Sequence, residues 1–358
     1  MPRERPFIEI AGRRIAADVP PYVVAEIGLN HGGSLDQAIA LVGAAAGSGA
    51  HAVKLQTLIA AELVSAACPA PAHVGAASLV DFFAQFEIDE AGHHAVVRRA
   101  RDLGLAVIAT PLSEPAVDLL ERVGVDAFKI ASGDLTWDAL IARCASTGRP
   151  LIISTGLATL AEAAHAVDVA RRHGAERVAL LHCVSAYPVP RGSENLAAIG
   201  RLAELGVPVG LSDHGGDAFA FPIAVALGAS IYERHLVLSD DHDAVDRAVS
   251  STPQELADAI EQARRAWTAL GSGDKACLAA EAPNLLPSRR SLHAARDLTA
   301  GCVLAAQDLV VIRPASGLPP AALPDVVGRP LAAAIDAGQP LLARHLGAEA
   351  PLERDRVA

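Results

Sequence analysis

The amino-acid sequence predicts an α/β protein in which a (β/α)8 (TIM) barrel is followed by a small β-rich domain. The chain has 358 residues, which exceeds the roughly 250 residues of a barrel by one small domain. Hydrophobic residues make up 51% and charged residues 20%, so a large core can form. Up to about residue 236, short apolar runs alternate with longer segments of helical period, which is the pattern of a parallel sheet.

The number of apolar runs predicts that this sheet closes. Eight strands are expected, and eight βα units form a barrel. The last barrel helix is predicted over Pro253–Leu270, because Ser251, Thr252 and Pro253 are helix start signals. The predicted strands are 22–26, 52–56, 105–109, 127–131, 151–154, 178–183, 207–211 and 230–233.

The chain is expected to divide at its C-terminal end. Residues 1–275 are assigned to the barrel. Residues 276–290 have no clear period and contain two prolines, which indicates a linker. Residues 291–350 contain short β-like pieces at 302–304 and 309–312 between Gly and Pro turns, so they are predicted to form the small domain.

Composition excludes several classes of partner and location. The formal net charge of -11 argues against nucleic acid or an anionic membrane as a partner. Residues 1–6 precede no apolar run, and no apolar stretch of 18 residues occurs, so a cytoplasmic protein is expected. The five cysteines are scattered, odd in number and without a CxxC pair, which predicts reduced thiols.

Polar side chains occur at the end of every predicted strand. In a barrel these C-terminal ends meet at one mouth, where active sites lie. In chain order the groups are Glu26 with Asn30 and His31; Lys54 and Gln56; Thr110; Lys129 and Ser132; Ser154 and Thr155; His182 and Ser185; Ser212, Asp213 and His214; and Glu233 and His235.

Two pairs of these residues indicate specific ligands. Lys54 and Lys129 lie inside apolar strands, and burying an ammonium without an anion costs several kcal/mol, so an anionic ligand is the simplest partner. His214 and His235 end adjacent strands, so their rings can converge on one divalent ion. Hydroxyl groups at the mouth suit a ligand carrying both phosphate and carboxylate. These hydroxyls belong to Thr110, Ser132, Ser154, Ser185 and Ser212.

The motifs at these positions resemble, in their order, those of the sialic acid (N-acetylneuraminate) synthase family, which includes legionaminic and pseudaminic acid synthases. The tail strings RRSL (289–292) and VIRP (311–314) resemble the family's antifreeze-like (SAF, β-clip) domain, so the resemblance covers nearly the whole chain. The barrel strings are AEIGLNH (25–31), VKLQT (53–57), ATP (109–111), KIASG (129–133), ISTG (153–156), LHC (181–183), YP (187–188), LSDH (211–214) and ERH (233–235).

The resemblance implies a role for each site residue. Glu26 is the expected catalytic carboxylate, Gln56 is expected to hold substrate near the metal, and His214 and His235 are expected to bind Mn²⁺, or Mg²⁺ or Co²⁺. Arg313 is expected to complete the sugar site of a partner subunit in a domain-swapped homodimer. Phosphoenolpyruvate would be bound by Lys54, Thr110, Lys129, Ser132, Ser154, Ser185 and Ser212, and the sugar by Asp134, Tyr187 and Asp246.

The implied reaction joins phosphoenolpyruvate to an open-chain N-acetylated amino sugar and water, giving a nonulosonic acid and phosphate. The acceptor is either N-acetylmannosamine or a diacetamido-trideoxy hexose. Asp134 stands where many bacterial members have Glu, and Ala244 and Val245 replace the usual Gly-Pro before Asp246. The acidic loop 240–243 is expected to contact the acceptor, with His242 as a solvated residue rather than a third metal ligand.

Three other functions agree less well with the sequence. A 3-deoxy sugar acid phosphate synthase would need a second phosphate site, but no further buried basic pair is apparent and those enzymes lack the antifreeze-like tail. A non-catalytic carbohydrate-binding protein would show loss of key groups, yet Glu26, both lysines and both histidines are present. A nicotinamide-dependent enzyme is disfavoured because GSG at 47–49 and at 271–273 does not open a helix with the required spacing.

Overall fold

The protein is described by a computed structural model that covers residues 5–65, 67–68 and 78–347. The chain divides into two compact units, with the break between Gly271 and Ser272. This break lies shortly before the predicted end of the barrel at residue 275, and the predicted linker 276–290 falls in the second unit. Residues 1–4 and residues 348–350 of the predicted small domain lie outside the described residues.

The first unit contains a closed barrel of eight parallel strands, as predicted. Strand β10 pairs with both β9 and β3, which closes the sheet. Every predicted strand overlaps an observed one. The barrel strands are β3 (Tyr22–Glu26), β4 (Ala52–Thr57), β5 (Ala106–Pro111), β6 (Ala127–Ile130), β7 (Leu151–Ser154), β8 (Val178–Cys183), β9 (Val209–Asp213) and β10 (Ile231–Leu236).

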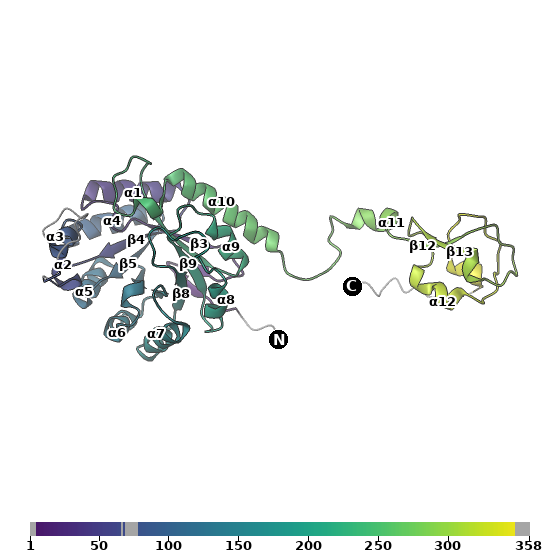
Figure 1. The fold of residues 1–358 in the computed structure, drawn as a ribbon, viewed down its shortest axis with the longest axis horizontal. Coiled ribbons are helices and arrows are strands. Elements are labelled where there is room, and N and C mark those ends of the chain that lie inside the picture. Colours follow the sequence, from purple (N-terminus) through teal and green to yellow (C-terminus); the bar gives the residue numbers. More distant parts are fainter. Residues whose placement is uncertain (1–4, 66, 69–77, 348–358) are drawn as a thin grey trace. The chain divides into compact units, whose positions relative to one another are not determined.

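Helices surround these strands (Figure 1). The predicted last helix is confirmed as α10 (Pro253–Leu270). A capping box stabilises its start: the Thr252 side chain accepts a hydrogen bond from the Glu255 backbone N–H, and Thr252 N donates to the Glu255 carboxylate at 2.8 Å. The other helices of this unit are α1 (Leu35–Gly47), α2 (Ala60–Leu63), α3 (Leu79–Ala84), α4 (Glu90–Asp102), α5 (Glu114–Val123), α6 (Asp138–Ala145), α7 (Leu160–Arg172), α8 (Ala198–Ala203) and α9 (Ala220–Ala226), with α10 at Pro253–Leu270.

Alternation along each strand separates two apolar cores. Every second residue of a strand, such as Val53 and Leu55 in β4, faces outward and packs beneath the helices. Residues of the other parity, such as Val24 and Ile108, fill the barrel interior. The N-terminal hairpin of β1 (Ile8–Ile10) and β2 (Arg13–Ile15), which the sequence analysis did not predict, adds its isoleucines to this interior cluster.

The interior becomes polar toward the C-terminal ends of the strands. Lys54 and Gln56 follow Ala52 on the interior face of β4, and Glu233 and His235 follow Ile231 on that of β10. The short strand β11 (Ser250–Ser251) extends the sheet beside β10. The apolar lower layers therefore position a polar layer at the mouth of the barrel.

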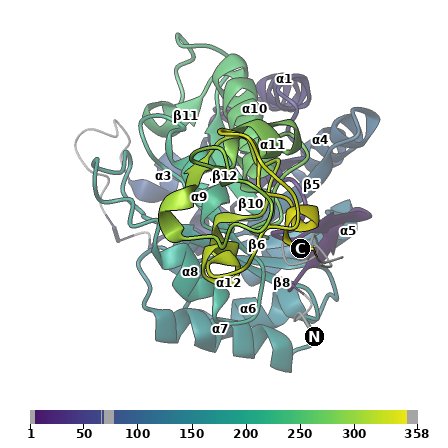
Figure 2. The same ribbon diagram turned by 90° about the vertical axis from the view of Figure 1, so that its right-hand side faces the viewer.

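The second unit is a small domain with little regular structure, drawn in green to yellow in Figure 2. Its strands β12 (Ser291–Ala294) and β13 (Leu309–Ile312) pair in antiparallel register. Of the two predicted β pieces, 309–312 forms β13, whereas 302–304 contributes only a bridge from Val303 to Pro330. Short helices are α11 (Leu285–Ser288) and α12 (Leu323–Val326), and the core includes Leu292, Leu298, Leu304, Leu331 and Leu341.

Two expectations from composition concern the whole chain. No helix among the described residues has the length and apolar character needed to cross a membrane. Cys144, Cys183, Cys277 and Cys302 are free thiols, as predicted, and Cys144 and Cys183 are buried.

Candidate active site

Four charged side chains form a buried network at the centre of the mouth. Lys54 Nζ is ion-paired with the Glu26 carboxylate and lies 3.1 Å from Glu233 Oε1. Lys129 Nζ lies 3.8 Å from the same Glu233 oxygen. None of the four residues is more than 6% exposed. Two carboxylates and two ammonium groups thus balance one another inside the barrel.

These contacts change the prediction about the partners of the two buried lysines. The buried lysines were expected to need an anionic ligand as partner, but Glu26 and Glu233 already serve as partners. Glu233 was also missing from the predicted roles. The reasoning that identified the two lysines applies equally to Glu233, because it is a charged residue inside the buried strand β10.

Burial and charge shift the pKa values of these groups in opposite directions. Burial lowers the pKa of Lys54 to about 8, and attraction to Glu233 opposes that shift. Burial would raise the pKa of Glu233, but the ammonium groups of Lys129 and Lys54 outweigh it and hold that pKa well below its usual range. Glu233 is therefore a carboxylate at neutral pH, while Lys54 can exchange a proton near that pH.

A second group of residues forms a cradle of donors beside Lys129. Lys129 Nζ donates to Ser154 Oγ at 2.5 Å. The Gly156 backbone N–H donates to Ser132 Oγ at 3.1 Å. A Cβ at Gly156 would collide with the hydroxyl groups of both Ser132 and Ser185, so these hydroxyls converge where only glycine fits. Hydroxyls beside an ammonium suit a phosphate or carboxylate.

The remaining predicted residues of β4, β5 and β9 also lie at the mouth. Gln56 and Thr110 are partners in register. The Gln56 amide and the Glu26 carboxylate both lie against Gly28, where a Cβ would collide with each. Ser212 donates its hydroxyl to Glu233 Oε1 at 2.9 Å, so its proton is committed to that carboxylate.

The structure brings the two predicted metal-binding histidines together. The ring centroids of His214 and His235 are 5.5 Å apart, and the Tyr187 ring lies 4.2 Å from that of His214. His214 Nδ1 is 3.3 Å from the Val184 carbonyl, which leaves Nε2 for another partner. His235 Nδ1 is buried without a hydrogen bond and lies 3.4 Å from Asp246 Oδ2.

These histidines fit a divalent ion that takes its other ligands from water and substrate. A buried imidazole nitrogen without a hydrogen bond, beside a second imidazole ring, is compatible with such an ion. Within the described residues, no group of three or more His, Cys, Asp or Glu side chains is placed to hold an ion. His242 instead accepts from Leu238 N and contacts Gln37 Oε1 at 3.1 Å, so it belongs to its loop.

The residues predicted to contact the sugar line the rim of the mouth. Asn30 holds the Asp246 loop, because its Oδ1 accepts from Asp246 N at 3.1 Å and its Nδ2 donates to Ser250 Oγ at 2.9 Å. Burial raises the pKa of Asp246 to about 6. Burial likewise raises the pKa of Asp134, which is half-buried on the turn Ser132–Asp134. Tyr187 is 54% exposed.

Other strand-end residues face away from the mouth. Thr155 Oγ1 donates to the Leu181 carbonyl at 2.9 Å, and His182 Nε2 lies 2.8 Å from the Glu194 carbonyl. The Asp213 carboxylate accepts from the Tyr232 hydroxyl at 2.7 Å.

Arg313 is exposed at the end of β13 in the second unit, and its role toward a partner subunit stays a prediction.

Unsatisfied polar atoms concentrate on the predicted residues. Across the described part of the chain, the buried side-chain oxygens and nitrogens without a hydrogen bond belong to Glu26, Thr110, Asp134 and His235. Of these, Glu26 Oε2 is ion-paired with Lys54 and His235 Nδ1 lies near Asp246, whereas Glu26 Oε1 has no such partner. Buried polar atoms normally find partners, so such atoms mark where a ligand completes the structure. All four residues were selected from the sequence as site residues.

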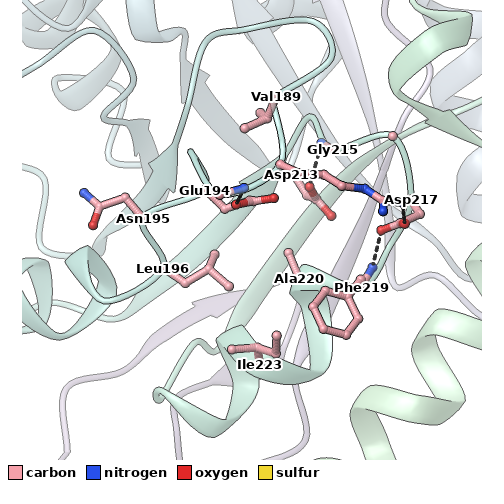
Figure 3. A pocket seen from close by; sticks show the side chains of 13 residues that line it. Val189, Glu194, Asn195, Leu196, Asp213, Gly215, Asp217, Phe219, Ala220 and Ile223 are labelled. Carbon is pink, nitrogen blue, oxygen red and sulfur yellow. Dashed lines mark hydrogen bonds and ion pairs between the residues drawn. The ribbon is translucent and has the colours of Figure 1, made fainter.

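A cleft of about 750 Å³ lies beside the mouth, between the segments that follow β8 and β9 (Figure 3). Leu196, Phe219 and Ile223 supply apolar lining, and Glu194 and Asp217 supply carboxylates. None of the predicted site residues lines this cleft, although Asp213 and Gly215 bring it next to the turn that carries His214. Most of its residues lie in loops without a periodic pattern, and the others come from β9 and α9, so no local motif in the sequence indicates it.

Comparisons with known proteins agree with the resemblance found in the sequence. Residues 41–275 match the NeuB family and residues 289–347 match the SAF domain. The chain is 34% identical to the N,N'-diacetyllegionaminic acid synthase of Legionella pneumophila, covering 91% of this chain and 95% of that protein. It is 30% identical to the pseudaminic acid synthase of Helicobacter pylori, covering 90% and 97%.

A solved structure agrees with these matches. The N-acetylneuraminic acid (sialic acid) synthetase of Leptospira borgpetersenii, in complex with citrate, superposes with a TM-score of 0.73 at 30% identity, covering 78% of this chain and 95% of that one. The ordered motifs, the closed barrel and the matches along most of the chain lead to one assignment: this protein belongs to the NeuB family.

Proposed function

We propose that the protein condenses phosphoenolpyruvate with an open-chain N-acetylated amino sugar and water, and releases a nonulosonic acid and phosphate. The relatives named above are synthases of legionaminic, pseudaminic and N-acetylneuraminic acids. The observation that carries the proposal is the set of buried polar atoms without a hydrogen bond: Glu26 Oε1, Thr110 Oγ1, Asp134 Oδ2 and His235 Nδ1. These atoms surround a mouth that already contains two buried ammonium groups.

Phosphoenolpyruvate binds in this proposal at the cradle formed by Lys129, Ser132, Ser154 and Ser185. Lys129 offsets part of the ligand's charge, and the hydroxyl groups donate to phosphate or carboxylate oxygens. The free hydroxyl of Thr110 supplies a further donor from β5. Because the Ser212 proton is committed to Glu233, Ser212 takes part through its oxygen or through that carboxylate.

The reaction forms one carbon–carbon bond and one carbon–oxygen bond to water, and it breaks the carbon–oxygen bond to phosphate. C3 of phosphoenolpyruvate bonds to the aldehyde carbon, and the aldehyde oxygen gains a proton and becomes a hydroxyl. Water adds at C2, and phosphate then leaves as the C2–O bond breaks. In this proposal Glu26 orients this water or accepts its proton, and Lys54, which is ion-paired with Glu26, can exchange that proton.

A divalent ion such as Mn²⁺ would polarise the aldehyde oxygen if bound by His214 and His235. Gln56 lies beside Glu26 and can hold the acceptor near these histidines. Asp246 and Asp134, whose pKa values burial raises, offer carboxyl oxygens to the hydroxyl groups of the sugar. The partly exposed Tyr187 ring packs against the buried His214 ring.

We further propose a cytoplasmic, domain-swapped homodimer in which the second unit of one chain brings Arg313 to the mouth of its partner's barrel. The presence of a separate SAF domain supports this assembly. Arg313 is exposed, so its guanidinium is available to another chain. A planar guanidinium suits recognition of the sugar's oxygens through paired hydrogen bonds.

The test is phosphate release from phosphoenolpyruvate in the presence of Mn²⁺ with a panel of acceptors. The panel contains N-acetylmannosamine, 2,4-diacetamido-2,4,6-trideoxy hexoses and arabinose 5-phosphate. Release with a free amino sugar supports the proposal and identifies the acceptor. Release only with the sugar phosphate would assign the chain to the 3-deoxy sugar acid phosphate synthases. No release and no binding of phosphoenolpyruvate would refute an enzymatic role at this site.

A further inference from the structure

Asp213 and Arg234 form a buried ion pair on the outer side of the barrel wall, behind the two histidines. Asp213 Oδ2 and Arg234 Nη1 are 3.5 Å apart, and the residues are 4% and 1% exposed. Each directly adjoins one histidine in the chain, since Asp213 precedes His214 and Arg234 precedes His235. Strand alternation points their side chains away from the mouth, so neither can contact substrate there.

Both side chains hold the backbone of the same residue, Gly215. Asp213 Oδ1 accepts from the backbone N–H of Gly215 at 2.9 Å (Figure 3), and Arg234 Nη1 donates to the Gly215 carbonyl at 2.8 Å. Gly215 immediately follows His214. The turn that carries His214 is therefore fixed on its two sides by a residue of its own strand and by a residue of the strand that carries His235.

Arg234 also connects this turn to the loop of Asp246. Its Nε donates to Ser251 Oγ at 3.0 Å on β11. The neighbouring Ser250 donates to the Asp246 carbonyl at 2.7 Å and pairs in register with His235. One guanidinium thus links three backbone segments that carry His214, His235 and Asp246.

Tyr232 completes the network. Its hydroxyl donates to Asp213 Oδ2 at 2.7 Å, and its ring stacks on Phe221 of α9 with centroids 3.7 Å apart. A buried ion pair contributes little net stability, because desolvation offsets the attraction, yet removal of one member is costly. Such a pair serves better to fix geometry than to strengthen the fold.

We infer that Asp213 and Arg234 are positioning residues that set the separation of His214 and His235 for one divalent ion. This inference rests on the proposed function, because it assumes that the histidines bind the ion. Groups that orient metal ligands typically change metal affinity about 10- to 100-fold when altered. The effect on phosphoenolpyruvate binding is indirect, since the cradle around Gly156 lies on other strands.

The experiment measures Mn²⁺ binding to the full-length chain by electron paramagnetic resonance, with thermal unfolding recorded for every variant. Arg234→Lys keeps the positive charge, but an ammonium group cannot donate to both Gly215 and Ser251 as the planar guanidinium does. Asp213→Asn keeps the size of the side chain and removes its charge. For both, we expect a dissociation constant for Mn²⁺ raised about tenfold or more, with metal-free phosphoenolpyruvate binding within about twofold of wild type. High Mn²⁺ concentrations should restore part of kcat.

The matched control is Arg143→Lys, which alters a partly buried arginine paired with Asp118 and Glu121 on the outer helices. It should leave Mn²⁺ affinity unchanged. Should Arg234→Lys or Asp213→Asn not fold, Tyr232→Phe decides, because it removes one hydroxyl donor and keeps the ring stack. A twofold or larger loss of Mn²⁺ affinity in Tyr232→Phe supports the inference, and wild-type affinity overturns it.

The outcomes separate this inference from the proposed function. Folded Arg234→Lys or Asp213→Asn with wild-type Mn²⁺ affinity and only a lower unfolding temperature would overturn the positioning role alone. Wild-type protein that releases phosphate without binding Mn²⁺ would overturn the metal role and this inference, while the condensation would stand. Wild-type protein that binds Mn²⁺ but turns over no acceptor would leave the positioning result standing and refute the proposed reaction.

Discussion

Lys54 and Glu233 form an ion pair across the mouth of the barrel, with Nζ 3.1 Å from Oε1, although β3 separates their strands β4 and β10 in the sheet. The pair connects the proposed water-activating group Glu26 to the cradle at Lys129. Because both members are buried, the loss of either leaves an uncompensated charge. The mouth is therefore a single electrostatic unit, and substitutions within it test the proposed roles.

Lys129→Met should raise the KM for phosphoenolpyruvate by at least about tenfold, because a charge-assisted hydrogen bond contributes about 1.5–3 kcal/mol. Glu233 keeps Lys54 and Ser212 as partners, so the variant should fold. Steady-state phosphate release measures the effect. The chain has only one lysine besides the two in the mouth, Lys275, and Lys275→Met is the control. An unchanged KM in Lys129→Met would contradict its assignment to the phosphoenolpyruvate site.

His235→Ala should abolish Mn²⁺ binding and turnover while the barrel stays folded, because the imidazole supplies one of two protein ligands in the proposed site. Mn²⁺ binding, circular dichroism and phosphate release check the three parts. His242→Ala is the matched control, since His242 bonds within its loop and to Gln37. Activity that persists at the wild-type level in chelator-treated buffer would rule out the metal role.

Gly156→Ala should weaken phosphoenolpyruvate binding more than acceptor use. An added Cβ would displace the Ser132 and Ser185 hydroxyls from the cradle. We expect the KM for phosphoenolpyruvate to rise at least about tenfold, because the loss of a hydrogen bond to a charged group costs about 1.5–3 kcal/mol. Gly133→Ala is the control, because a Cβ there meets no atom within 4 Å. Equal effects of the two substitutions would show that the cradle does not bind this substrate.

His51 should make the barrel less stable in mild acid. Burial lowers the pKa of His51 to about 4, from 6.5 in the unfolded chain, and its Nδ1 accepts from Val23 N at 2.8 Å. Between these pH values the unfolded chain binds a proton that the native state does not. The contribution of neutral His51 to the free energy of unfolding is therefore present above pH 6.5 and lost as pH falls toward 4.

The comparison of wild type with His51→Gln measures this contribution. The loss of unfolding free energy between pH 7 and pH 5 should be smaller by about 2 kcal/mol in the variant, as the linkage relation gives for such a shift. Chemical denaturation at each pH provides the values. His94→Gln, at a half-exposed position on α4, is the control. Identical pH profiles for wild type and His51→Gln would contradict the prediction.

Arg313→Ala should reduce use of the sugar more than binding of phosphoenolpyruvate, if the second unit acts on a partner's barrel. The sharper test mixes this variant with Lys129→Met under conditions that exchange subunits. Action in trans lets a mixed dimer combine an intact barrel with an intact Arg313, so activity should recover to roughly a quarter of wild type or less by random pairing. No recovery with proven exchange would show that Arg313 acts within its own chain or not at all.

The sequence alone determined the eight strands, the position of the mouth and most residues that line it. These features are local: strand alternation fixes which residues share a face, and the C-terminal end of each strand fixes what reaches the mouth. Lys54, Thr110, Ser154 and His235 were found in this way. The two-domain organisation likewise followed from a change in local pattern near residue 290.

Only the tertiary structure decided which of these groups are partners. Glu233 pairs with Lys54 because closure of the barrel brings β10 and β4 to the two sides of β3. Asp213 and Arg234 meet behind the wall because adjacent strands pair in one register. Ion pairs and unsatisfied atoms depend on distances between residues far apart in the chain, and no local pattern in the sequence encodes those distances.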